Sequence, residues 1–133
     1  KEIDVYNNGN HSRDFTYVDD IVEGIYLSSI SKKELIDSNF DSKDPSRSFC
    51  KSIIFNLGRG KPENLEDFID EIENNLGKRA KRNLMPLQPG DVPDTSADIS
   101  GLKDFSGYEP KTSIKIGVKN FIDWYKEYYK VNL

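Results

Sequence analysis

The chemistry open to this chain is limited first by residues that it lacks. His11 and Cys50 are the only histidine and the only cysteine among 133 residues, so no Cys/His cluster can hold a structural zinc. No tyrosine is followed four residues later by a lysine, the one-turn spacing at which an ammonium activates a phenol to take a proton from a hydroxyl. No glycine pattern typical of a dinucleotide or P-loop site is present. We therefore expect no catalytic residue, no metal site and no cofactor site in this sequence.

Charge and hydropathy exclude two classes of partner. The net charge is −4 and the isoelectric point about 5.1, whereas nucleic-acid binding needs a basic face. The densest basic stretch, Lys78–Arg82, follows Gly77 and is expected to be a solvated helix end and strand start. No apolar run approaches the roughly 18 residues of a membrane span. A single cysteine fits a reducing compartment, so we expect a cytoplasmic protein that binds neither nucleic acid nor membrane.

Hydrophobic periodicity predicts a mixed α/β fold of about four helices and several short strands. Strands are expected at 2–6, 15–18, 51–57 and 82–87. Helices are expected at about 20–30, 65–76, 98–105 and 114–128, and an exposed loop in the second half of 31–47. The predicted helix caps are Asp19 or Asp20, Asn64, Asp98 and Ser113, with glycine stops at Gly77 and Gly107.

Three sequence blocks, in order, resemble the extended short-chain dehydrogenase/reductase family, specifically its nucleotide-sugar epimerases and dehydratases. Asn8–Asp20 is similar to the family's G-x-x-x-R-D-F-x-Y-V-x-D block, and Phe55–Gly60 to its Y-N-[LI]-G-x-G strand and turn. Pro86–Asp98 is similar to the P-G-D-x-x-x-T-x-A-D block. Within it, Leu87–Val92 resembles the bacterial UDP-glucuronate 4-epimerases. The resemblance leaves only about 32–52 unaccounted for.

The resemblance implies roles for two charged residues. Arg13 matches the arginine that contacts the substrate's diphosphate, a role suited to the planar fork of a guanidinium. Asp91 matches the acid that binds the ribose hydroxyls of the nucleotide, where a carboxylate accepts from a cis-diol. The alternatives are an Arg13 that is solvated in a turn or pairs locally with Asp14, and an ordinary turn aspartate at 91.

The resemblance implies substrate-binding positions for three further residues. Gln88 stands where many relatives carry a phosphate-binding arginine, so it keeps a hydrogen-bond donor but loses the charge. Phe15 and Tyr17 match residues of the sugar-nucleotide cleft, and packing under the first helix is the open alternative for both.

Taken as a whole, the resemblance implies that residues 1–133 form the C-terminal substrate-binding domain of a longer enzyme. An N-terminal Rossmann domain would carry NAD and the Tyr/Lys pair, and the parent would interconvert UDP-glucuronate and UDP-galacturonate for polysaccharide biosynthesis. A 4,6-dehydratase or decarboxylase of the same family and a non-enzymatic binding module are the alternatives. This chain alone is expected to be inactive, to bind no cofactor, and to self-associate through the apolar face that the Rossmann domain would cover.

Overall fold

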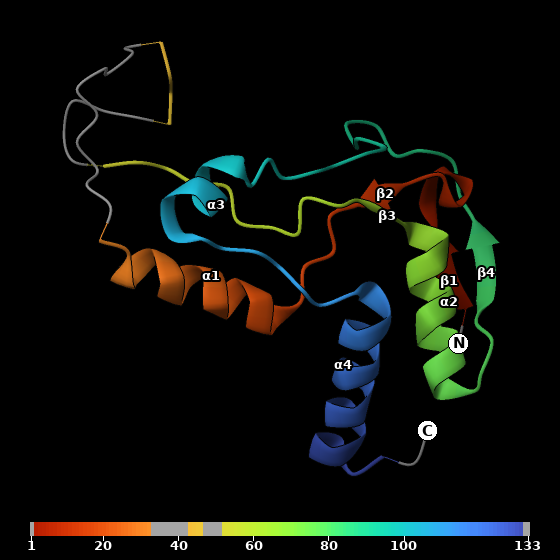
Figure 1. The fold of residues 1–133 in the computed structure, drawn as a ribbon. Coiled ribbons are helices and arrows are strands. Elements are labelled where there is room, and N and C mark those ends of the chain that lie inside the picture. Colours follow the sequence, from red (N-terminus) through yellow and green to blue (C-terminus); the bar gives the residue numbers. More distant parts are fainter. Residues whose placement is uncertain (1, 33–42, 47–51, 132–133) are drawn as a thin grey trace.

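The computed structural model describes residues 2–32, 43–46 and 52–131 (Figure 1). The helices within these ranges are α1 (Val18–Ile30), α2 (Leu65–Leu76), α3 (Ser100–Ser106) and α4 (Ile114–Tyr129), with a short 3-10 helix η1 (Tyr6–Gly9). The strands are β1 (Glu2–Val5), β2 (Ser12–Arg13), β3 (Glu63–Asn64) and β4 (Lys81–Leu84). This confirms the predicted mixed α/β class with four α-helices and short strands. In the described part of the chain, no helix is long and apolar enough to cross a membrane.

The strands form two small pairs. β1 and β4 are parallel, in a register that places Glu2 opposite Lys81 and Val5 opposite Leu84. β2 and β3 are antiparallel, and Ser12 also bridges to Asp94. The strand predicted at 2–6 is therefore found, and the one predicted at 82–87 begins and ends earlier.

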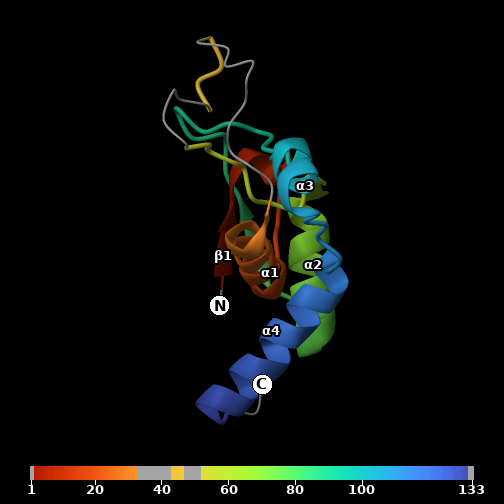
Figure 2. The same ribbon diagram turned by 60° about the vertical axis from the view of Figure 1, so that its left-hand side comes forward.

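Helices α2 and α4 lie side by side in both ribbon views (Figures 1 and 2) and bury one apolar seam. Ile69 from α2 and Val118 and Ile122 from α4 are buried there, as the i, i+3, i+4 spacing of apolar residues on both helices predicts. Of the predicted signals at the ends of the last three helices, Ser113, Gly77 and Gly107 are confirmed, whereas Asn64 precedes α2 without a side-chain cap and the N-cap of α3 is Ile99 in place of Asp98. Ser113 Oγ accepts from Ile116 N at 3.4 Å, and Gly77 ends α2 at a φ of 66°.

A second packing centre joins α1 and α3 to the segment before α4 (Figure 1). Tyr108 is fully buried, and its hydroxyl donates to the Gly58 carbonyl at 2.8 Å. Burial raises the pKa of Tyr108 to about 12, because the phenolate would lose its hydration, and the charge of Asp20 adds to this. Gly24 lies so close to this centre that a Cβ there would sit 2.4 Å from Leu57 Cδ1.

The basic stretch after Gly77 is not simply solvated. Arg79 and Arg82 bind carboxylates of α2, with Arg79 Nη1 2.6 Å from Glu73 Oε2 and Arg82 Nη2 2.6 Å from Asp70 Oδ1. The Arg79 guanidinium, the Ala80 N–H and then Arg82 lower the pKa of Glu73 to about 2. These ion pairs fix β4 against the side of α2.

Two predicted strands are not found. Val18 starts α1, so 15–18 is not a strand. In residues 52–57, the described part of the strand predicted at 51–57, only Ile53 forms an isolated bridge. The neighbouring Ile54 is 69% exposed. A strand needs a hydrogen-bonding neighbour, and the described residues provide no ladder for this segment. The loop predicted in 31–47 lies mostly outside the described residues.

Neither aspartate predicted to cap the first helix does so, and one of them has another role. The N-cap of α1 is Tyr17, which makes no side-chain cap, and Asp19 and Asp20 lie in the first turn. Asp20 is buried, and its carboxylate accepts from Lys111 N at 3.3 Å and Thr112 N at 3.0 Å. Asp20 therefore ties the start of α1 to the segment that leads into α4, where unsatisfied N–H groups would otherwise be costly.

Candidate functional site

Arg13 and Asp91 are 78 residues apart in the sequence and adjacent in the structure. Arg13 Nη2 lies 3.1 Å from Asp91 Oδ1. Arg13 ends β2, and Asp91 ends a turn in which Asp91 N donates to the Gln88 carbonyl at 3.1 Å. Gly90 enters this turn at a φ of 86°, a conformation that glycine adopts at little cost. The bridge from Ser12 to Asp94 brings the two segments together.

The carbonyl of Pro93 is the common acceptor at this junction. It accepts from Ser12 N at 2.9 Å and from Arg13 Nη1 at 2.8 Å, and His11 Nδ1 lies 3.2 Å from it. Arg13 Nη1 also donates to the Ser12 carbonyl at 2.9 Å. Three acceptors thus hold the guanidinium, yet the Arg13 side chain is 28% exposed. Because a guanidinium has five N–H groups, a part of its donor capacity remains for an incoming anion.

Asp14, next to Arg13, connects all three sequence blocks. Its carboxylate accepts from the backbone N–H groups of Arg59 at 3.0 Å, Gly60 at 2.9 Å and Ala97 at 2.9 Å. Asp14 is therefore occupied by backbone donors, and the described carboxylate that pairs with Arg13 is Asp91. The local Arg13–Asp14 pair considered from the sequence is not what the structure contains.

Gln88 is exposed at the start of the turn, and the hydrogen bond that it makes to Asp91 uses its main-chain carbonyl. Among the described residues, no hydrogen bond joins the Gln88 side chain to the Arg13–Asp91 pair, so its substrate-binding role stays a prediction.

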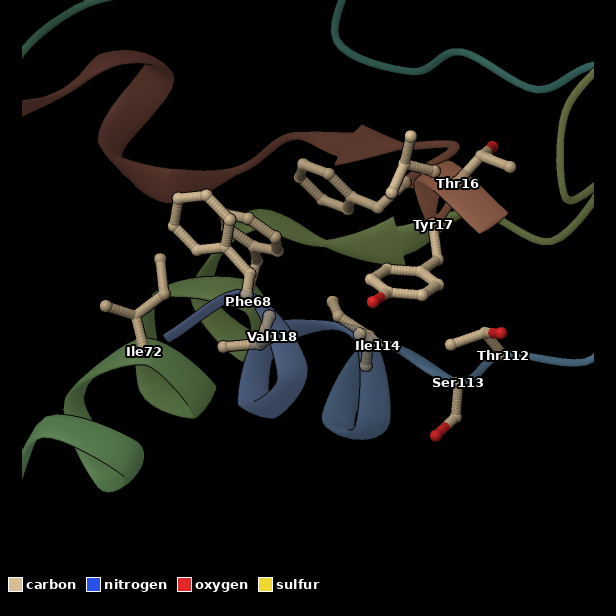
Figure 3. Close-up of a pocket in the computed structure, with 12 residues that line it drawn as sticks. Thr16, Tyr17, Phe68, Ile72, Thr112, Ser113, Ile114 and Val118 are labelled. Atoms are coloured by element: carbon tan, nitrogen blue, oxygen red, sulfur yellow. The ribbon is translucent and has the colours of Figure 1, made fainter. Parts of the chain in front are cut away.

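Phe15 and Tyr17 line an apolar cavity of about 290 Å³ between the start of α1 and helices α2 and α4 (Figure 3). The ring of Phe15 stacks on Phe68, with centroids 4.2 Å apart and planes at 7°. In Figure 3, Phe68 and Val118 point from α2 and α4 into the same space. Neither Arg13 nor Asp91 lines this cavity. These contacts agree with the packing alternative for Phe15 and Tyr17, and the structure does not bring the two aromatic rings to the charged pair.

His11 is the residue of this region that the sequence did not reveal. The sequence places it in a polar turn, but the structure leaves only 6% of it exposed. Its Nε2 has no hydrogen-bond partner among the described residues and lies 3.5 Å from Asp91 Oδ2. No local pattern could have predicted this burial, because it depends on the 91–94 segment, about 80 positions away.

The described residues do not fit a dinucleotide or a metal ion. The two strand pairs form no doubly wound sheet with a glycine-rich turn at a helix N-terminus, which is the usual NAD site. The described part of the chain also contains no group of three or more His, Cys, Asp or Glu side chains arranged to hold a metal. What the arrangement can do is bind an anion and a hydroxyl-bearing group side by side.

Comparisons with known proteins show which family the chain resembles. Protein CapI of Staphylococcus aureus is 48% identical over 131 residues, which cover 96% of this chain and 39% of that protein. The probable UDP-glucuronate 4-epimerase of Rhizobium meliloti is 35% identical over 134 residues, covering 98% and 39% respectively. The chain is a partial-length match to the nucleotide-sugar epimerases of the extended short-chain dehydrogenase/reductase family. No family model matches it.

The structural comparison gives the same family. The UDP-glucuronic acid 4-epimerase of Bacillus cereus, solved in complex with UDP-glucuronic acid and NAD, matches with a TM-score of 0.75 and 27% identity. The match covers 97% of this chain and 36% of that one. The chain thus spans about 30 to 40% of the length of the curated relatives that it matches.

Proposed function

We propose that this chain binds the nucleoside diphosphate of a UDP-sugar, as the C-terminal substrate-binding part of an NAD-dependent 4-epimerase. The observation that carries the proposal is the Arg13–Asp91 pair, 3.1 Å apart and open to solvent on one side. A diphosphate meets the free N–H groups of Arg13 while the adjacent ribose hydroxyls donate to Asp91. Binding energy from these remote parts of the substrate positions the sugar for reaction elsewhere.

The names of the relatives support the substrate class. Several of the curated relatives are named UDP-glucuronate 4-epimerases, which favours conversion of UDP-glucuronate to UDP-galacturonate over dehydration or decarboxylation. In the parent protein, we propose that NAD and the acid/base pair belong to the part of the relatives that this chain does not match. This chain alone would then bind substrate without turning it over.

The exposed side of α1 supports the presence of a covering domain in the parent. Its apolar side chains recur at helical spacing, and each is more than half exposed: Val18, Val22, Ile25, Tyr26 and Ile30. Such a stripe is typical of an interaction surface. We propose that the NAD-binding domain covers this stripe in the parent protein. In the isolated chain, a second copy of the chain covers it.

The proposal is tested by calorimetric titration of the chain with UDP and with UDP-glucuronate at low salt. Arg13→Ala should weaken binding of both by about tenfold to a hundredfold, because one or two charge-assisted hydrogen bonds are lost. Lys115→Ala is the matched control: it removes the same charge from an exposed position on α4 and should leave the affinity unchanged. Equal effects of both substitutions, or no UDP binding by the unaltered chain, would contradict the proposed site.

A further inference from the structure

His11 combines burial with an unused ring nitrogen. Its Nδ1 lies 3.2 Å from the Pro93 carbonyl, and a carbonyl only accepts, so Nδ1 carries a hydrogen. The other nitrogen, Nε2, is buried, has no hydrogen-bond partner in the part of the chain that the structure describes, and faces Asp91 Oδ2 at 3.5 Å. Buried polar atoms in proteins are nearly always satisfied, so an unpartnered one beside a functional carboxylate calls for a role.

The contacts of the two Asp91 carboxylate oxygens point to that role. Oδ1 already accepts from Arg13 Nη2 at 3.1 Å and from Val92 N at 2.9 Å, whereas Oδ2 faces His11. A diphosphate competes for Arg13 and brings further negative charge close to Asp91. The carboxylate then needs another donor to keep its position and its charge. Among the described residues, His11 Nε2 is the nitrogen placed behind Oδ2 to become that donor.

We propose that His11 is a positioning residue for Asp91. When a nucleoside diphosphate engages Arg13, His11 Nε2 takes up a proton from solvent, and the resulting imidazolium donates from Nε2 to Asp91 Oδ2 and holds the carboxylate against the ribose hydroxyls. The Pro93 carbonyl fixes the ring through Nδ1, so that the movement needed is a closing of the 3.5 Å separation and not a rotation of the imidazole. This inference rests on the proposed function and adds a residue to it.

Two substitutions separate the roles of the two ring nitrogens. The amide of His11→Asn can occupy the place of Nδ1 and keep the bond to Pro93, but it has no atom at the place of Nε2. The longer side chain of His11→Gln puts its amide near the place of Nε2. Each variant is titrated with UDP and with 2′,3′-dideoxy-UDP, which lacks the hydroxyls that Asp91 would bind, and its thermal unfolding is recorded to show that it is folded.

We expect His11→Asn to weaken UDP binding about tenfold and to leave binding of the dideoxy ligand unchanged, because one hydrogen bond to a charged group is lost. His11→Gln should stay within about threefold of the unaltered chain for both ligands. An equal loss for the two ligands, no loss for either, or a His11→Gln variant as weak as His11→Asn would overturn the role of Nε2. If the unaltered chain binds UDP through Arg13 but does not distinguish the two ligands, the ribose role of Asp91 fails, and this inference with it.

A spectroscopic measurement tests the same role without a substitution. His11 is the only histidine of the chain, so the imidazole ¹⁵N signals in an NMR spectrum belong to it alone. Saturation with UDP should shift the Nε2 resonance to that of a protonated, hydrogen-bonded nitrogen, and the dideoxy ligand should produce a smaller shift. An Nε2 signal unchanged by UDP would overturn the proposal, because a residue that only stabilises the fold gives no ligand-dependent change there.

Discussion

Replacing Asp14 should separate the three sequence blocks that build the site. Its carboxylate accepts three backbone N–H bonds, from Arg59, Gly60 and Ala97, at 2.9 to 3.0 Å. A hydrogen bond to a charged group contributes about 1.5–3 kcal/mol, but these donors are partly open to water, which replaces some of the loss. We therefore expect Asp14→Ala to lower the free energy of unfolding by about 3 kcal/mol. Asp14→Asn should lower it by about 1–2 kcal/mol, because one oxygen becomes a donor that faces another donor.

The assay is urea unfolding followed by circular dichroism, with the slope of free energy against urea checked for constancy. Asp19→Asn is the matched control, since Asp19 is exposed in the first turn of α1 and should lose about 0.5 kcal/mol or less of helix-dipole stabilisation. UDP affinity is measured in the same samples and should fall with Asp14→Ala. If that substitution costs less than about 0.5 kcal/mol, the three bonds do not hold the blocks together and the reasoning is wrong.

Three further outcomes follow from the structure. Glu73→Gln should remove a stabilisation that the unaltered chain keeps above pH 4.5 and loses as the pH falls toward about 2, because the folded-state pKa of this carboxyl is depressed; acid titration of the unfolding transition measures it. Tyr108→Phe should cost about 1 kcal/mol at neutral pH through the lost bond to Gly58. Because the folded-state pKa of Tyr108 lies above the unfolded value of 10, its contribution to stability is lost at high pH and not at low pH. The unaltered chain should therefore lose stability as the pH rises from 10 to about 12, and the variant should lose less. Val22→Glu should shift the isolated chain toward monomer in sedimentation velocity, whereas Asn74→Glu on the exposed side of α2 should not.

Local signals in the sequence predicted the helices well. The cap at Ser113 and the left-handed glycine at Gly77 act within one turn of the chain, so residue type alone indicates where α4 begins and α2 ends. The strand prediction for 51–57 was wrong for its described part, 52–57. β-branched and aromatic residues indicate a pleated, half-buried surface, but a ladder also needs a partner strand.

The candidate site was likewise predictable from the sequence only in part. The motif blocks predicted that Arg13 and Asp91 matter, and the structure places them together. The burial of His11 and the three backbone bonds of Asp14 could not be predicted, because each depends on segments 45 to 83 positions away. Asp20 shows the limit of local reasoning most plainly: its position favours a helix cap, but its carboxylate binds the backbone before α4.

A crystal structure of the chain soaked or grown with UDP tests the central claim most directly. The account predicts that the diphosphate lies within hydrogen-bond distance of the Arg13 guanidinium and that the ribose hydroxyls lie within the same distance of the Asp91 carboxylate. UDP bound in the apolar cavity beside Phe15 and Tyr17, or bound elsewhere while Arg13 and Asp91 keep their 3.1 Å contact untouched, would contradict it.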